Sequence, residues 1–453
     1  MPLTEFYTNK GKAIFNMNVL FHTLGCKVNQ YETQAMRRIM ENEGWHTDEY
    51  HADTQISDDG LAIVINSCTV TGESDRKLRQ LLRRMRRSHP AAILVLTGCM
   101  PQAFPEIADR FTQADIVLGN ASRKELPRQI HRFLTLGQRI VEITGHNDKF
   151  ESLSIDEFQG RTRAFVKIED GCNRFCSYCI IPYARGRVRS KPLDELRTEL
   201  ESLADRGYSE IVLVGINLTA YGQEWNGSVC DAAELACSIS GIRRVRLGSL
   251  EPDLMTPEVI ERLAALDQLC PQFHLSLQSG CADTLRRMNR HYTPDEYAAV
   301  CENLRRHFPD CAITTDVMVG FPGEDQREFE ESLGLVQQMG FSRVHIFAYS
   351  PRPGTPAAKA SRQVAGAEKT HRSRRMSEVC EISRDAYLDL WKGRTVEVLI
   401  ETGVEDGHFE GYTPQYIPVR INAKGKTLSP GEIVSVGITG NYEGVCEGEV
   451  ICP

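Results

Sequence analysis

Apolar runs alternating with helical patterns mark the first part of the chain. Runs at 18–23, 61–66, 91–97 and 115–118 predict strands, and the spacing over 30–43 and 73–87 predicts helices between them. Strands that are apolar throughout and alternate with helices are typical of a parallel sheet covered on both faces. We therefore expect a small, doubly wound domain over 17–145.

The second part, expected over 158–385, repeats a strand–helix unit. Its predicted strands lie at 164–169, 211–215, 245–249, 273–277, 313–320 and 344–349. Helical patterns at 193–206, 257–265, 294–306 and 328–339 lie between most of them. Six such units predict a partial (β/α)6 barrel, in which chemistry takes place at the carboxyl ends of the strands.

The pattern changes again near the C-terminus. Charged residues at helical spacing over 361–390 predict a linker or packing helix. Short alternating runs at 395–400, 416–421 and 432–438, separated by glycines, predict a small β-barrel over 388–453. The fold class is therefore α/β with a β-barrel at the C-terminus.

Composition indicates the class of protein, its cellular compartment and the role of its cysteines. Hydrophobic residues make up 41% and charged residues 25% of the 453, a balance that excludes a disordered chain. No apolar run is long enough to span a membrane, and the first residues lack a signal peptide's apolar core, so a cytoplasmic location is expected. In that compartment the 15 cysteines favour metal binding over disulfides wherever their spacing is tight.

Cys172, Cys176 and Cys179 directly follow a predicted strand. Thiolates are the usual ligands of iron–sulfur clusters, and three of them leave one iron of a 4Fe–4S cluster open. The spacing C-x3-C-x2-C resembles that of radical S-adenosylmethionine enzymes, in which the open iron holds the cofactor's amino and carboxylate groups. A structural zinc site is the alternative, but it usually needs four ligands, and no second pair lies nearby.

Three further cysteines each follow a strand of the first part: Cys26, Cys68 and Cys99. Because the ends of parallel strands line up along one edge of a sheet, these thiols are expected to lie close together. The interpretation is a second metal site, and the alternative is three cysteines buried in a sheet.

A basic amphipathic helix is predicted at 76–87, with seven cations and no acid in twelve residues. Leu78, Leu81, Leu82 and Met85 form its apolar stripe. A solvated face is the alternative, but we favour contact with RNA phosphates in a chain of net charge −8. The expected RNA contacts are Arg83, Arg84, Arg86 and Arg87, together with Arg185, Arg187 and Arg189 beside the cluster loop.

Motifs over nearly the whole chain resemble the methylthiotransferase family, and within it the MtaB branch. They are TLGCKVNQYET (23–33), NSCTVT (66–71), TGC (97–99), DGCNRFCSYCIIPYARGR (170–187), SLEP (249–252), HLSLQSG (274–280), RMNR (287–290), TDVMVGFPGE (315–324) and YSPRPGTP (349–356). The C-terminal barrel resembles a TRAM domain, which this family uses to engage substrate.

The resemblance implies an enzyme that adds a methylthio group to C2 of a threonylcarbamoyl-modified adenosine next to the tRNA anticodon. It implies two 4Fe–4S clusters and S-adenosylmethionine, with Cys172, Cys176 and Cys179 as the catalytic cluster ligands. Cofactor contacts are then expected from Tyr178, Ser276, Gln278, Arg290 and Asp316. An external electron donor such as flavodoxin is also implied, and the sulfur donor is not defined. A radical suits this reaction because an aromatic C–H bond is not acidic enough for a side-chain base.

Two other functions were weighed. From residue 391 onward the C-terminal part carries five Lys/Arg against nine Asp/Glu, and this net negative charge disfavours binding to RNA phosphates. It keeps open a sister branch that modifies a basic ribosomal protein, although the residues after Gly25-Cys26 argue against that branch. A non-catalytic iron–sulfur sensor that binds RNA would need neither an open iron nor six barrel units.

Overall fold

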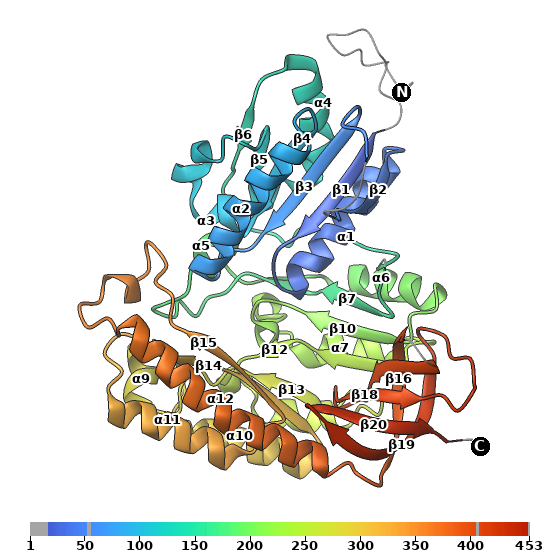
Figure 1. Cartoon of the computed structure of the whole chain (residues 1–453), viewed down its shortest axis with the longest axis vertical. Helices are drawn as coiled ribbons and strands as arrows, with labels where there is room; N and C mark the ends of the chain where they lie inside the picture. Colours follow the sequence, from blue (N-terminus) through green and yellow to red (C-terminus); the bar gives the residue numbers. More distant parts are fainter. Residues whose placement is uncertain (1–16, 52–55, 159, 405–406, 452–453) are drawn as a thin grey trace.

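The first part of the chain is a six-stranded parallel sheet with helices on both faces (Figure 1). The structure is a computed structural model that describes residues 17–451 except 52–55, 159 and 405–406. The sheet has the order β2-β1-β3-β4-β5-β6. Its strands are β1 (Asn18–Thr23), β2 (His46–Glu49), β3 (Leu61–Ser67), β4 (Ile93–Gly98), β5 (Ile116–Leu118) and β6 (Ile140–Glu142).

Apolar side chains on the two faces of this sheet meet different helices. One face packs against α1 (Lys27–Asn42) and α4 (Leu126–Leu136), and the other against α2 (Gly72–Ser88) and α3 (Cys99–Ala103). The expected doubly wound sheet is therefore confirmed. The sequence pattern missed β2 and β6 at the two edges, because neither has a continuous apolar run.

The central part is an open barrel of parallel strands. Its two sheets have the orders β11-β10-β7 and β12-β13-β14-β15, and a parallel bridge pairs Val245 of the first sheet with Leu269, three residues before β13. The strands are β7 (Arg163–Lys167), β10 (Glu210–Val214), β11 (Arg244–Leu247), β12 (Ser249–Leu250), β13 (Gln272–Leu275), β14 (Ala312–Val319) and β15 (Arg343–Ala348). Within the described residues, β7 and β15 do not pair, so the predicted partial barrel is confirmed.

The helices around these strands complete the repeating units. They are α5 (Ile181–Arg185), α6 (Leu193–Asp205), α7 (Val229–Ser238), α8 (Pro257–Ala264), α9 (Ala282–Arg287), α10 (Pro294–His307) and α11 (Gln326–Met339). A short antiparallel pair, β8 (Glu169–Asp170) with β9 (Arg189–Ser190), flanks the cluster loop. The large core of this part also includes Val28, Tyr31 and Ala35 of α1, so the first two parts share one apolar interior.

The charged stretch before the C-terminal part forms α12 (Gly366–Asp389), which packs against α11 and β15 (Figure 1). It leads into a closed barrel of order β16-β17-β18-β20-β19, as expected. The strands are β16 (Thr395–Gly403), β17 (His408–Tyr412), β18 (Pro418–Asn422), β19 (Ile433–Tyr442) and β20 (Val445–Val450). Across the described ranges, no helix is both long enough and apolar enough to cross a membrane.

Candidate active site

Cys26, Cys68 and Cys99 lie at the carboxyl ends of three adjacent strands. Cys68 directly follows β3 and Cys99 directly follows β4, and the preceding residues Ser67 and Gly98 are register partners. Cys26 caps the start of α1, three residues after β1, and its Sγ lies 3.2 Å from Asn29 Oδ1. Gly98 has φ 102°, and a Cβ there would clash with the Ser67 backbone, so glycine permits this close approach.

The three thiols are close enough to influence one another. Burial is the main reason that the pKa of Cys68 rises to about 12, and the nearby Cys99 and Cys26 thiolates contribute to this rise. Desolvation raises the pKa of Cys26, which lines a cavity, and Cys99 again adds to the rise. Three convergent sulfurs match the thiolate ligands of a 4Fe–4S cluster with one iron left open.

The second cysteine set occupies the loop after β8. Burial raises the pKa of Cys172 to about 11 and of Cys179 to about 12, and in both cases the neighbouring Cys176 thiolate adds to the rise. The Arg174 backbone N–H donates to Cys172 Sγ at 3.4 Å. This compact donor set also fits a 4Fe–4S cluster bound through three thiolates.

Arg290 connects this loop to the end of β13. Its Nη1 donates to Cys176 Sγ at 3.3 Å, and its Nη2 donates to the Ser276 carbonyl at 3.2 Å. It also forms an ion pair with Glu251. Two of the expected cofactor contacts, Arg290 and Ser276, therefore lie together beside the loop, and Glu251 joins them.

The other expected cofactor contacts are Tyr178, Gln278 and Asp316, and each has defined neighbours. Tyr178 packs edge-on to Phe321, with ring centroids 6.3 Å apart. Gln278 has φ 65°, and its backbone N–H donates to the Asp316 carbonyl at 2.8 Å. The Asp316 side chain lies 3.3 Å from His274 Nε2, on the inner surface of the barrel.

A cavity of about 570 Å³ lies inside the open barrel and reaches the first cysteine set. It is lined by Cys26, Lys27, Val28, Val214, Gly215, Leu247, Gly248, Ser249, Gln272, His274, Thr314, Asp316, Arg343, His345, Phe347 and Tyr416. Residues of all three parts of the chain therefore line one space, whose volume suits a small-molecule or nucleoside guest.

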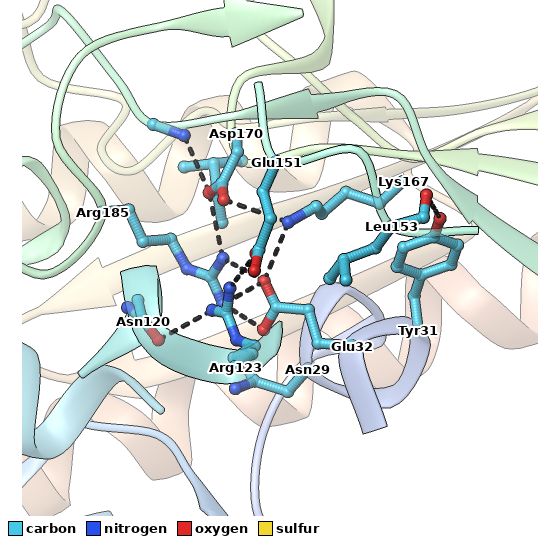
Figure 2. A network of polar contacts seen from close by, with 12 residues as sticks. Asn29, Tyr31, Glu32, Asn120, Arg123, Glu151, Leu153, Lys167, Asp170 and Arg185 are labelled. Atoms are coloured by element: carbon cyan, nitrogen blue, oxygen red, sulfur yellow. Dashed lines mark hydrogen bonds and ion pairs between the residues drawn. The ribbon is translucent and has the colours of Figure 1, made fainter. Parts of the chain in front are cut away.

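A buried network of charges joins the first two parts of the chain (Figure 2). Glu32 of α1 lies at its centre, within 3.0 Å of Arg123 and Lys167 and 2.8 Å of Arg185. Asp170, two residues before Cys172, receives Arg185 Nη1 at 2.9 Å and Lys167 Nζ at 3.1 Å. The cation of Arg185 also lies near the Cys99 thiol, so this network connects the surroundings of both sets.

Glu32 should be a large contributor to stability. Burial alone would raise the pKa of Glu32, but Arg123, Arg185 and Lys167 outweigh it and lower this pKa to about 2. Because the pKa is lower in the folded state, the contribution is present at neutral pH and is lost as the pH falls from about 4.5 toward 2. Glu32→Gln should lower the free energy of unfolding by about 3–5 kcal/mol, since it leaves buried cations uncompensated.

Chemical denaturation of the two proteins at neutral pH would measure this difference. Glu73→Gln is the matched control, because Glu73 pairs with Arg76 on the exposed face of α2 and its loss should scarcely change stability. Equal unfolding midpoints for Glu32→Gln and Glu73→Gln would show that the network does not stabilise the fold.

The structure separates the expected RNA contacts into two groups. Arg83, Arg84, Arg87 and Arg187 are exposed. Arg189 is partly buried, and its Nη2 donates to the Arg185 carbonyl at 2.8 Å.

Two of the expected RNA contacts need correction. Arg185 is only 1% exposed and is held by Glu32 and Asp170, so it is not placed to reach an RNA phosphate. Arg86 is bound to the Asp115 carboxylate and to backbone carbonyls, including that of Ala92 at 2.9 Å, so its guanidinium is already engaged.

Sequence reasoning missed several residues of the site. Glu251 lies in a recognised motif just after a strand, and that position could have identified it. Lys27 directly follows Cys26, but the sequence does not show that it lines a cavity. Glu32 lies in the motif at 23–33, but its burial between two parts of the chain appears only in three dimensions.

Comparisons with known proteins agree with this geometry. Residues 166–336 match the family described as "Radical SAM superfamily", and residues 18–119 match "Uncharacterized protein family UPF0004". Among solved structures, the radical S-adenosylmethionine methyltransferase TsrM from Kitasatospora setae, with cobalamin and a [4Fe-4S] cluster bound, superposes with a TM-score of 0.56 at 15% identity. The match covers 76% of this chain and 77% of TsrM, and at that identity it supports the fold alone.

Curated relatives cover nearly the full length. The threonylcarbamoyladenosine tRNA methylthiotransferase MtaB of Bacillus subtilis is 36% identical over 429 residues, which is 93% of each chain. The tRNA-2-methylthio-N(6)-dimethylallyladenosine synthase of Clostridium novyi is 33% identical over 454 residues, which is 98% of each. With these identities over almost the whole chain, the protein belongs to the radical S-adenosylmethionine methylthiotransferase family, in its MtaB branch.

Proposed function

We propose that this chain is a tRNA methylthiotransferase that replaces the C2 hydrogen of N6-threonylcarbamoyladenosine, next to the anticodon, with a methylthio group. The observation that carries the proposal is the shared cavity. Cys26 of the first cysteine set lines it, together with Ser249, His274 and Asp316 of the barrel strands. An adenine bound there would lie beside the first set and against the inner face of the barrel whose loop after β8 carries the second set.

Each cysteine set has a separate task in this proposal. Cys172, Cys176 and Cys179 hold the cluster that binds S-adenosylmethionine, and Cys26, Cys68 and Cys99 hold the cluster that handles sulfur. When bound, these groups would supply a carbon radical at the loop after β8 and a sulfur ligand at the Cys26, Cys68 and Cys99 set.

The residues of the chain hold and orient the reactants. Arg290 fixes the Cys176 side of the loop against Ser276, and Glu251 balances its charge. Tyr178, Ser276, Gln278, Arg290 and Asp316 are proposed to contact the cofactor. Val28, Leu247 and Phe347 give the cavity apolar surface against which a planar base can pack.

An assay with defined components tests this proposal. Anaerobically reconstituted protein would be incubated with S-adenosylmethionine, sulfide, a reductant and an anticodon stem-loop containing N6-threonylcarbamoyladenosine. Mass spectrometry of the digested RNA should show the 2-methylthio nucleoside. Cofactor cleavage without this product, together with modification of a ribosomal protein, would favour the sister branch. Absence of cleavage would favour a sensor.

Further features of the enzyme belong to the same proposal. We place it in the cytoplasm, with an external electron donor such as flavodoxin. We divide the chain into an N-terminal domain at 17–145, a radical S-adenosylmethionine core at 158–385 and a TRAM-like barrel at 388–453. The barrel contributes Tyr416 to the cavity, which gives it a role at the substrate site despite its acidic composition.

The exposed face of α2 is proposed as a surface for tRNA phosphates. Arg83, Arg84 and Arg87 are exposed there, whereas Leu78, Leu82 and Met85 are buried against the sheet. Changing the three arginines to Gln should weaken tRNA binding and make it less sensitive to salt. The slope of log affinity against log salt concentration should become shallower by about 0.7–0.9 for each phosphate contact that is lost.

Salt titrations of tRNA affinity would measure this slope. Arg197→Gln is a control, because Arg197 is an exposed arginine on α6 that lies 4.0 Å from Glu201, and it should leave the slope unchanged. If the triple variant also keeps the wild-type slope, α2 is only a solvated face and RNA binds elsewhere.

A further inference from the structure

Lys27 places a cation inside the proposed substrate cavity. It is the first residue of α1, directly after Cys26, and its half-buried side chain lines the cavity. Its Nζ lies 5.8 Å from the ring centroid of Phe165 and 5.9 Å from that of Tyr416. The ammonium is thus bordered by aromatic rings from the central and C-terminal parts of the chain.

The carboxylates around Lys27 are engaged with other groups. Glu210 lies 3.1 Å from Arg246, 3.6 Å from Arg244 and 3.8 Å from Arg163. Asp316, the acid that lines the cavity, pairs with His274. Within the described parts of the chain, no carboxylate oxygen lies within 4.0 Å of Lys27 Nζ.

The cavity is therefore cationic where it meets Cys26. Arg343, at the start of β15, is a second cation of its lining, and no ion pair holds it among the described residues. A partly buried ammonium without a carboxylate partner is costly, so a site of this kind suits a ligand that brings a carboxylate.

The two groups of curated relatives differ in the charge of the N6 substituent that their names specify. A threonylcarbamoyl group ends in a carboxylate that is ionised at neutral pH, whereas a dimethylallyl group is a neutral hydrocarbon. On adenine, C2 and C6 flank N1 on the same edge of the ring, and C6 carries N6. A base whose C2 faces the Cys26 set therefore directs its N6 substituent toward the neighbourhood of Cys26.

We propose that Lys27 binds the carboxylate of the threonylcarbamoyl group and so selects this substrate. The inference rests on the proposed function and adds a residue that determines specificity. Arg343 contributes positive potential to the same cavity, and the Phe165 and Tyr416 rings confine the lysine side chain.

A binding comparison tests this role without relying on turnover. The probes are two anticodon stem-loops of identical sequence, one with N6-threonylcarbamoyladenosine and one with unmodified adenosine. Wild-type protein should prefer the modified RNA by about ten- to hundredfold, as expected for one charge-assisted hydrogen bond. Lys27→Met should lose most of this preference because it loses affinity for the modified RNA, and Lys27→Arg should retain much of it.

Controls separate this role from other effects of the substitution. Iron content of Lys27→Met should match the wild type, which verifies that the neighbouring cluster site is intact. Lys77→Met removes an exposed lysine from α2 and should change the affinity for the two RNAs by the same factor.

Three results would overturn the proposal. The first is that Lys27→Met weakens the binding of both RNAs equally, which would indicate a phosphate contact. The second is an unchanged preference for the modified RNA in that variant. The third is that the wild-type protein shows no preference. If product forms in the methylthiolation assay but Lys27→Met keeps its preference, the specificity proposal fails while the proposed function stands.

Discussion

Replacing Cys172, Cys176 or Cys179 with Ala should reduce formation of 5′-deoxyadenosine from S-adenosylmethionine to background. Each thiol is one of only three in the loop after β8, so its loss leaves the cluster short of a ligand. Chromatography of reactions with reconstituted protein and a strong reductant measures this product. Iron content should fall at the same time, because the set that remains has two thiols.

The control for these variants is Cys380→Ala, a buried cysteine of α12 outside both sets. It should retain both iron and cleavage. Undiminished 5′-deoxyadenosine formation in any one of the three loop variants would refute the assignment of these cysteines.

The triple variant Cys26→Ala, Cys68→Ala and Cys99→Ala should have the opposite combination of properties. It should still cleave S-adenosylmethionine, because the loop after β8 is unchanged, but it should form no methylthio product. Iron and acid-labile sulfide should fall to about half of the wild-type values, since one of two 4Fe–4S clusters is lost. The measurements are iron analysis, 5′-deoxyadenosine yield and nucleoside mass spectrometry on the same preparation.

The outcome separates two readings of these cysteines. If the triple variant keeps all of its iron, the three residues are ordinary buried cysteines and there is no second cluster site. If it loses iron but still forms the methylthio nucleoside, the second cluster is not needed for sulfur transfer.

The architecture was largely predictable because hydrophobic pattern controls it. Continuous apolar runs identified β3 and β4, and alternation of strands with helices gave both the doubly wound sheet and the open barrel. Edge strand β2 is mostly exposed and polar, so its pairing with β1 depends on the neighbouring strand rather than on its own sequence. Strands β17 and β20 were missed for a similar reason, since closure of the barrel supplies their partners.

The site was predictable only where the residue types themselves indicate the chemistry, as cysteines do for a metal site. Cysteines at strand ends could be placed because parallel strands align their carboxyl ends. The positions of charged side chains could not be predicted, because an exposed arginine and a buried one look the same in the sequence. Arg185 and Glu32 show this, since their pairing joins segments 153 residues apart.

Nucleoside mass spectrometry of tRNA from a strain that lacks this protein is the decisive test of its function. We expect 2-methylthio-N6-threonylcarbamoyladenosine to disappear and N6-threonylcarbamoyladenosine to accumulate. Wild-type protein should restore the methylthio nucleoside, whereas the Cys26, Cys68 and Cys99 triple variant should not. A normal level of 2-methylthio-N6-threonylcarbamoyladenosine in the deletion strain would show that another protein makes this nucleoside.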